Sequence, residues 1–276
     1  MKKIISLFIA LLILFFINAQ ESKDGYFVFV QGGTFKMGDD NGANDEKPAH
    51  EVTLNSFWIG KYEVTQKEFF EVMGYNNSKF KGDDRPMENV SWYEAIEFCN
   101  KKSQKDGLKP VYKIDKTQKD PNNLNSGDTQ KWIITIDKTA NGYRLPTEAE
   151  WEFAARGGLK SKGYKYSGAN EIEKVAWFGK TPKEGTNPVG KLQPNELGIY
   201  DMNGNIFEWC WDWYDVTYYS KSPKENPTGP EKGEAKVMRG GSWDRAANFM
   251  SVSTRNSINL WFSSRINGFR ICKNEK

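Results

Sequence analysis

The stretch Arg239-Gly240-Gly241-Ser242-Trp243 decides the fold of this chain, and it runs on to a second short motif, Gly268-Phe269-Arg270. Two longer motifs precede it, and they read Gly142-Tyr143-Arg144-Leu145-Pro146-Thr147-Glu148-Ala149-Glu150-Trp151-Glu152 and Asn195-Glu196-Leu197-Gly198-Ile199-Tyr200-Asp201-Met202-Asn203-Gly204-Asn205-Ile206-Phe207-Glu208-Trp209. From residue 157 onwards the chain is rich in glycine, proline, asparagine and aromatic residues, which predicts short strands joined by irregular loops.

Together these motifs strongly resemble the formylglycine-generating enzyme (sulfatase-modifying factor) family. The resemblance covers roughly residues 27–272, nearly all of the chain. It implies an α+β fold, the formylglycine-generating-enzyme variant of the C-type lectin fold, with short mixed strands, few helices and much irregular structure. We therefore predict a single domain over residues 20–276.

Residues 1–19 have the composition of a secretory signal peptide. Lys2 and Lys3 precede the apolar run 4–17, and Ala19 offers a small residue for cleavage. A membrane anchor is the alternative, but a span needs roughly 20 apolar residues. We expect export to the periplasm, the cell surface or the medium, with no membrane attachment after cleavage. Removing the two lysines lowers the formal charge of +3 by two, and the remaining basic residues are scattered, so no nucleic-acid partner is expected.

Three helices are predicted by the same start signal, in which a hydroxyl residue and a glutamate three positions later bond each other's backbone amides. The pairs are Thr65 with Glu68, Ser91 with Glu94, and Thr147 with Glu150. Strands are predicted at residues 26–30, 34–37, 50–54 and 57–62, the first two joined by a turn at Gly32-Gly33. Residues 111–114 and 132–136 predict a hairpin with a polar, mobile tip at 116–130.

The histidine and cysteine content excludes several kinds of catalytic site. His50 is the chain's one histidine, so multi-histidine iron, copper or zinc sites are excluded and a catalytic triad has no support. Cys99 lies on an apolar helical face, which predicts a small buried side chain. Export would allow Cys210 and Cys272 to form a disulfide, and the sequence leaves that pairing open.

Residues 201–208 are a candidate calcium site. Two carboxylates flank a tight Asn-Gly turn, and such a turn can aim backbone carbonyls inward beside them, a mixture of oxygens that calcium prefers. A plain turn with solvated acids is the alternative. The resemblance implies one ion held by the side chains of Asp201 and Glu208 and the carbonyls of Gly204 and Ile206. Residues 175–189 offer no match to a second family site, so we predict one structural calcium that holds the loop rigid.

The family's reaction depends on residues that this chain lacks. Family enzymes oxidise a cysteine of a target sulfatase to formylglycine, with oxygen and a copper ion held by two cysteines. The corresponding places here hold Arg245 and Met250. A permanent cation repels copper, and one thioether does not replace two thiolates, so copper and oxidase activity are not expected.

The C-terminal segment mixes aromatic, small and polar residues, as binding surfaces do. The candidate surface comprises Ser242, Trp243, Asp244, Arg245, Asn248, Phe249, Asn259, Trp261 and Phe262. In the alternative, these are closing strands and loops with Trp261 and Phe262 in the core, and Ser242, which matches a family active-site serine, is a turn residue. The segment also resembles the variable region of diversity-generating retroelement proteins.

Three functions follow from these observations. The first is a non-catalytic binding or scaffold module that recognises a protein, peptide or glycan. The second is an active sulfatase-maturing oxidase, which Arg245 and Met250 oppose. The third is a retroelement-diversified ligand-binding protein with a C-type-lectin-like fold.

Overall fold

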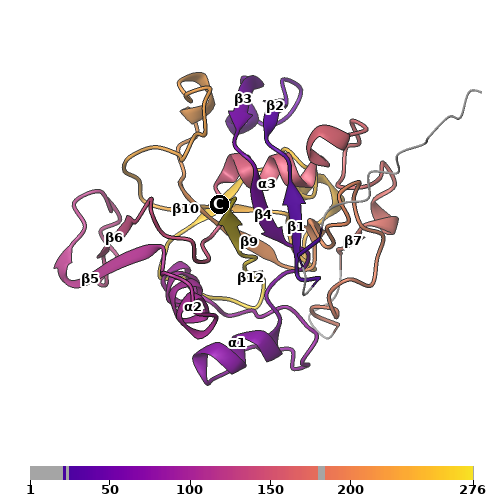
Figure 1. Ribbon diagram of the computed structural model, residues 1–276. Helices are drawn as coiled ribbons and strands as arrows, with labels where there is room; N and C mark the ends of the chain where they lie inside the picture. Colours follow the sequence, from indigo (N-terminus) through magenta and orange to yellow (C-terminus); the bar gives the residue numbers. More distant parts are fainter. Residues whose placement is uncertain (1–20, 23–24, 180–183, 276) are drawn as a thin grey trace, which may run out of the picture.

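The computed structural model describes residues 21–22, 25–179 and 184–275, and the predicted signal peptide at residues 1–19 lies outside them. The described chain has three α-helices and many short strands joined by long irregular segments (Figure 1). This is the α+β class predicted from the motifs. None of the helices in the described ranges has the length and apolar character needed to cross a bilayer.

All three helices begin at the predicted hydroxyl residues. They are α1 (Gln66–Met73), α2 (Trp92–Lys105) and α3 (Glu148–Ala155). The reciprocal bonds are complete at Ser91 and Thr147. The start of α1 is only half formed, because Thr65 accepts a bond from the Glu68 amide while the Glu68 carboxylate accepts one from the Tyr26 hydroxyl at 2.8 Å.

Two sheets form the centre of the molecule. The three-stranded sheet has the order β1-β4-β13, with β1 (Phe27–Val30), β4 (Phe57–Gly60) and β13 (Cys272–Asn274), so it joins the two ends of the described chain. The four-stranded sheet has the order β11-β10-β9-β12, with β9 (Phe207–Trp213), β10 (Lys236–Arg239), β11 (Asn256–Ile258) and β12 (Asn267–Gly268). Within this four-stranded sheet β12 runs parallel to β9, and the other described pairings are antiparallel.

The remaining strands form three small pairs. These are β2 (Gly33–Met37) with β3 (His50–Leu54), β5 (Tyr112–Lys119) with β6 (Trp132–Ile136), and β7 (Ala176–Trp177) with β8 (Asn203–Gly204). The β5–β6 hairpin is the one predicted from the sequence. Its tip is packed rather than free, because the Tyr93 hydroxyl of α2 donates to buried Asp128 at 2.6 Å.

The predicted pairing of residues 26–30 with 34–37 is wrong. β1 pairs with β4, and β2 pairs with β3. The chain changes partners at Gly32, where a Cβ would overlap the Leu54 carbonyl oxygen of the neighbouring segment. The glycine pair therefore allows a close backbone crossing between two strand pairs, and not a tight turn within one.

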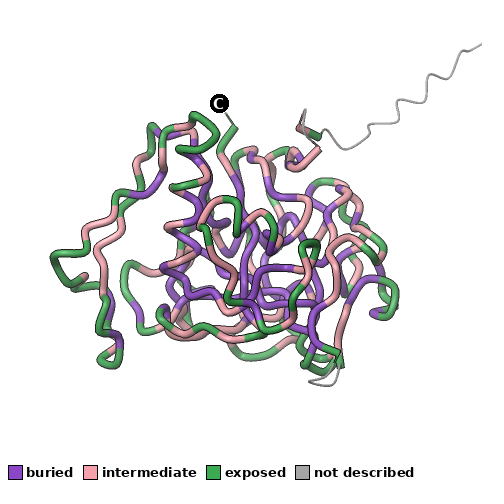
Figure 2. Tube along the Cα trace, turned by 90° about the horizontal axis from the view of Figure 1, so that it is seen from below, coloured by how far each residue is buried: buried purple, intermediate pink, exposed green. Residues whose placement is uncertain are grey.

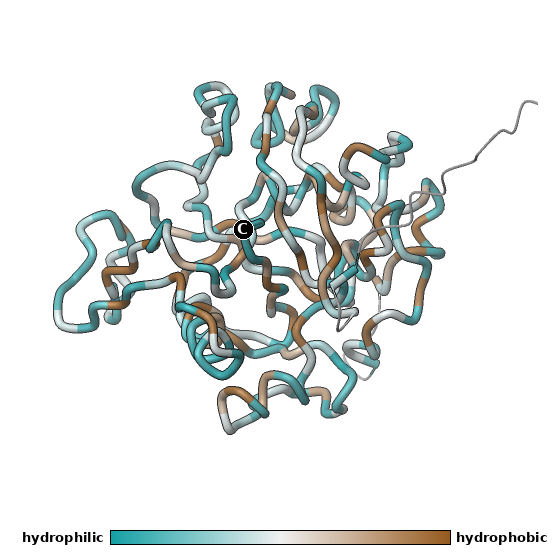
Figure 3. Tube along the Cα trace, viewed as in Figure 1, coloured by the Kyte–Doolittle hydropathy of each residue, from teal (hydrophilic) through white to brown (hydrophobic). Residues whose placement is uncertain are grey.

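The four-stranded sheet separates two apolar cores. Along β9, Trp209 and Trp213 point to the core that contains α1 and α2, whereas Cys210 points to the core that contains α3. Buried residues fill the interior, and exposed residues lie mainly on the outlying loops (Figure 2). The apolar stretches likewise gather on the central strands, and the peripheral loops are mostly hydrophilic (Figure 3).

Candidate functional site

The motif Arg239–Trp243 begins at the last residue of β10 and turns beneath the C-terminal segment. Gly241 has a φ of 79°, which favours glycine, and a Cβ there would overlap Met250 Sδ. The Trp243 indole is fully buried and donates to the Arg265 carbonyl at 3.0 Å. Arg239, at the end of β10, is fully buried as well. The motif is therefore structural, and it fixes the path of the segment that follows.

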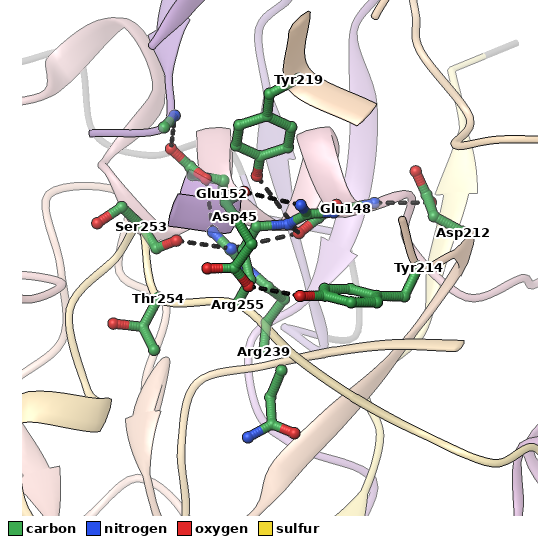
Figure 4. A network of polar contacts seen from close by, with 12 residues as sticks. Asp45, Glu148, Glu152, Asp212, Tyr214, Tyr219, Arg239, Ser253, Thr254 and Arg255 are labelled. Atoms are coloured by element: carbon green, nitrogen blue, oxygen red, sulfur yellow. Dashed lines mark hydrogen bonds and ion pairs between the residues drawn. The ribbon is translucent and has the colours of Figure 1, made fainter. Parts of the chain in front are cut away.

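Beneath that segment lies a buried ionic network of two arginines and two glutamates (Figure 4). Arg255 donates to both carboxylate oxygens of Glu148, at 2.7 and 2.8 Å. Arg239 donates to Glu148 at 3.3 Å and to Glu152 at 2.5 Å. Each buried charge thus has a partner of opposite sign, which buried ions require. Both glutamates belong to α3, within the predicted Gly142–Glu152 motif.

The network also anchors the backbone around it. Arg239 donates to the carbonyls of Val252 and Ser253 at 2.7 and 2.9 Å, and Arg255 donates to the Asp45 carbonyl at 2.8 Å. Burial alone would raise the pKa of Glu152, but Arg156 and Arg239 outweigh it and hold the pKa below its ordinary value. Glu152 therefore stays charged, and the bonds of the network position residues 252–255 and the loop around Asp45.

A polar groove of about 820 Å³ opens above this network. The loop at 36–49 forms one side, and residues 163–165 and 248–255 form the other, with Arg255 among the lining residues. Two residues of the predicted binding surface, Asn248 and Phe249, line this groove. Phe249 is 43 % exposed, so an apolar ring stands among mostly polar lining residues.

The predicted surface divides by burial into three groups. Asp244, Arg245, Asn248, Phe249 and Trp261 are exposed, Asn259 and Phe262 are half-buried, and Ser242 and Trp243 are buried. Trp261 is 43 % exposed, so the alternative that places it in the core does not hold. The buried pair supports the surface from beneath.

The two positions that correspond to the family's copper ligands do not form a metal site. Arg245 is exposed and its Nε lies 3.6 Å from the Asp244 carboxylate. Met250 is fully buried in an apolar cluster with Tyr166 and Ile172. The Arg245 guanidinium repels a metal cation, and the single enclosed thioether of Met250 does not replace two thiolates, so these two side chains do not fit copper.

The three cysteines lie elsewhere, and all are free and buried. The Cys210–Cys272 disulfide that the sequence left open is not formed. Cys99 is buried on α2, as its place on the apolar helical face predicts. Burial raises the pKa of each thiol, and Cys272 Sγ accepts a bond from Arg144 Nη1 at 3.0 Å. Protonated, enclosed thiols are poor metal ligands and poor nucleophiles.

The predicted calcium segment is buried as a unit. Asp201 and Asn205 adopt φ values of 56° and 57°, which bend residues 201–208 tightly. One Asp201 oxygen accepts from the Gly190 amide at 2.6 Å, and the other, Oδ1, is buried without a partner. Both Glu208 oxygens are occupied, since they accept from Arg270 at 2.6 Å, and Oε2 also accepts from the Trp151 indole at 2.7 Å.

A third acid, Glu63, lies in the same place and was missed from the sequence. It is fully buried and accepts bonds from Asn205 Nδ2 and the Ile206 amide. Burial, together with the charges of Asp201 and Glu208, raises its pKa well above the ordinary value. Its only signal in the sequence is an acid at the end of a strand. Among the described residues, Glu63, Asp201 and Glu208 thus lie around Arg270, and Asp201 Oδ1 is the oxygen left without a partner.

In the described ranges no three His, Cys, Asp or Glu side chains converge closely enough to hold an ion by themselves. An ion beside Asp201 would therefore depend on backbone oxygens, such as those of Gly204 and Ile206 in the predicted set. Glu208 fits that set less well, because Arg270 already occupies its carboxylate.

Residues 16–275 match the family described as "Sulfatase-modifying factor enzyme 1-like domain". The chain belongs to this family. Within the sulfatase-modifying factor family, it is 46 % identical over 243 residues to "Chaperone protein LppX" of Paenibacillus barcinonensis, covering 82 % of this chain and 81 % of the relative. It is 32 % identical to the formylglycine-generating enzyme of Streptomyces coelicolor, over 90 % of this chain and 88 % of that enzyme.

Other similarities bear on length and on the fold. The chain spans 38 % of the longer "Serine/threonine-protein kinase pkn1" of Chlamydia caviae, at 31 % identity over 90 % of this chain. The solved structure of "Treponema denticola variable protein 1" superposes with a TM-score of 0.80 at 34 % identity, covering 90 % of this chain and 95 % of that one. Its likeness covers nearly the whole chain, in agreement with the predicted fold.

Proposed function

We propose that this chain is an exported, non-catalytic binding module of the sulfatase-modifying factor family. The observation that carries the proposal is the pair Arg245 and Met250 at the family's copper-ligand positions. One presents a cation to solvent, and the other is sealed in an apolar cluster against Gly241. Two thiolates are the usual soft ligands for copper in such a site, and neither residue is one.

The ligand that we propose is a polypeptide segment held in the groove between the 36–49 loop and residues 248–255. The groove is mostly polar and mixed in charge, and Phe249 gives it one exposed aromatic anchor. Such a surface suits backbone hydrogen bonds and one buried aromatic contact. The Paenibacillus relative is named a chaperone, and proteins of that class act on polypeptides.

Two experiments test the proposal. Titration of the purified chain with Cu(I), followed by incubation with a cysteine-containing sulfatase peptide, is expected to show no stoichiometric copper binding and no aldehyde. Formation of formylglycine would overturn the non-catalytic assignment. Sequencing the N-terminus of the protein recovered outside the cytoplasm tests export, with a mature start after Ala19 as the expected result.

The groove is tested by screening the mature chain on peptide and glycan arrays. Phe249→Ala is expected to weaken the best peptide about tenfold, or roughly 1.4 kcal/mol. Phe70→Ala is the matched control, because Phe70 is 56 % exposed on α1 and lies outside the groove. Binding of glycans alone, or equal binding by Phe249→Ala and the wild type, would contradict a peptide ligand in this groove.

A second candidate, a diversified binding protein, is favoured by one comparison. The superposed Treponema protein is named a variable protein, and it is 34 % identical to this chain. The exposed residues of the candidate surface lie within the segment 244–261, and variation limited to those exposed positions would leave buried Met250 and Arg255 intact. An adenine-mutagenised template repeat beside the gene would support this function. Its absence would contradict diversification and favour a binding module of fixed sequence.

A further inference from the structure

A second pocket lies on the opposite face of the β9–β10 pair from the groove. It has a volume of about 260 Å³ and lies between the β5–β6 hairpin, the 228–231 segment and the β9–β10 pair. Four tryptophans line it, and they are Trp92, Trp132, Trp211 and Trp213. No motif of the family or residue of the predicted surface accounts for it.

The pocket contains a buried lysine, Lys236, the first residue of β10. It is 2 % exposed, and its Nζ lies 3.9, 4.4 and 4.9 Å from the ring centroids of Trp213, Trp92 and Trp211. Nζ donates one hydrogen bond, to the Trp211 carbonyl at 2.8 Å. An ammonium has three donors, so this group keeps donor capacity towards the pocket.

Lys236 has no ion pair among the described residues. Asp212 is the strongest neighbouring charge, but it alternates to the other face of β9 and accepts a bond from the Glu148 amide at 2.9 Å. Asp120 and Glu231 line the pocket without pairing with Nζ. Burial lowers the pKa of Lys236 to about 7, against the opposing effect of Asp212 and Asp120. An unpaired buried cation is costly, and a bound anion would offset that cost.

We propose that this pocket binds a small carboxylate carried on a single ring, with the carboxylate on Lys236 Nζ and the ring against the tryptophan faces. The volume lies just below the range for drug-sized ligands, which limits the occupant to about one ring. Flat aromatic walls complement a ring face, whether aromatic or sugar. A cationic ligand is excluded, because Lys236 already occupies the tryptophan cage. Asp120 and Glu231 at the wall disfavour a dianion such as phosphate.

The site is independent of the proposed groove, because the two lie on opposite faces of one sheet. Its ligand could come from two sources that share the same chemistry, an aromatic acid or a uronic acid sugar. The test uses the mature chain, with sodium benzoate and sodium glucuronate as acids and with benzamide and glucose as their neutral counterparts. Tryptophan fluorescence and calorimetry at pH 6.5 measure binding.

At least one acid is expected to bind, and its neutral counterpart at least tenfold more weakly. Lys236→Met, which keeps an unbranched side chain, is expected to abolish acid binding while its melting temperature equals or exceeds that of the wild type, which establishes that it folds. Lys116→Met is the matched control, because Lys116 also lies over a tryptophan ring, Trp132, but is half exposed and paired with Glu97.

Binding of benzoate alone would identify an aromatic acid as the ligand, and binding of glucuronate alone would identify a uronic acid sugar. Failure of both acids to bind, equal binding of the neutral compounds, or retained binding by Lys236→Met would overturn the proposal.

Discussion

Individual buried charges in this protein differ in whether a partner of opposite charge compensates them. Glu148 accepts bonds from Arg255 and Arg239 with almost no exposure, whereas Lys236 is equally buried and has no partner of opposite charge. Breaking a balanced buried pair leaves an uncompensated charge, while removing an unpaired one relieves a cost. Removing the charge should therefore destabilise the fold at Glu148 and stabilise it at Lys236.

Glu148→Gln is predicted to destabilise the fold by about 3–5 kcal/mol, because the buried Arg255 would lose its carboxylate partner and Arg239 would keep only Glu152. Urea unfolding monitored by tryptophan fluorescence measures the change. Glu171→Gln is the control, since Glu171 is exposed and pairs only with Lys174 on the surface, and its unfolding midpoint should not move. A Glu148→Gln protein as stable as the wild type would mean that the network is not a structural anchor.

Lys236→Met is predicted to stabilise the fold most at low pH. The pKa of Lys236 falls from an ordinary 10.5 to about 7 on folding. Between these values the unfolded chain binds a proton that the native chain lacks, so the wild type gains stability as pH rises. Burial raises the pKa of Asp212 to about 8 and Lys236 lowers it, so in the variant Asp212 loses a stabilising cation, which also reduces the variant's advantage as pH rises. The difference in melting temperature between variant and wild type should be largest near pH 6 and should shrink towards pH 9, and a constant difference would contradict the depressed pKa.

For individual residues, the sequence predicted their chemical role better than it predicted whether they are buried. Arg245 and Met250 could be identified from their place after the Arg-Gly-Gly-Ser motif alone. That Trp243 is buried while Trp261 is exposed depends on which face of an irregular loop meets the core, and no periodic pattern encodes that. Glu63 lies beside Asp201 only because the segment that follows β4 carries it there from about 140 residues away in sequence, and a contact so distant leaves no local signal.

The element that most invites a direct test is the 201–208 loop. Burial and the neighbouring carboxylates raise the pKa of Glu63 well above its ordinary value, burial raises that of Asp201 to about 6, and Asp201 Oδ1 has no partner. If calcium binds there at a concentration 100 times its Kd, it stabilises the fold by about 2.7 kcal/mol. For a chain of this size that corresponds to a rise in melting temperature of roughly 5–10 °C.

Asp201→Ala is predicted to lower the melting temperature and to abolish its dependence on calcium. Glu171→Ala, which removes an exposed acid from another loop, should keep the wild-type response. Calorimetric melting with calcium and with chelator measures both effects. If the wild-type protein melts at the same temperature with calcium and with chelator, the proposal of a structural calcium ion is wrong.

Helix starts were predictable because their signals are local. A hydroxyl residue and a glutamate three positions later lie within one turn, and all three predicted starts are present, although Glu68 bonds Tyr26 instead of the α1 backbone. Strand pairing was less predictable. The β5–β6 hairpin joins segments that are adjacent along the chain, but β1 pairs with β4 across the intervening β2–β3 pair, and β4 pairs in turn with β13 at the far end of the chain. Such partners are chosen by tertiary packing.

At the scale of the whole molecule, the two faces of the β9–β10 strand pair support different sites. One face rests on α3 and the arginine network below the groove, and the other carries the tryptophan pocket. Because a single strand pair supports both, each site depends on the same sheet for its rigidity. That shared support implies that the described chain unfolds as one cooperative unit.

The three buried thiols provide a test of this cooperativity. Cys99 lies in α2, Cys210 in β9 and Cys272 in β13, so together they sample both cores and both sheets. A thiol reagent should label none of them in the folded protein, because each is enclosed and has a raised pKa. In moderate urea all three should be labelled at one common rate, since exposure then requires global opening. Mass spectrometry of the labelled peptides measures each site separately, and earlier labelling of Cys99 than of Cys210 would mean that the α1–α2 core opens as a unit of its own.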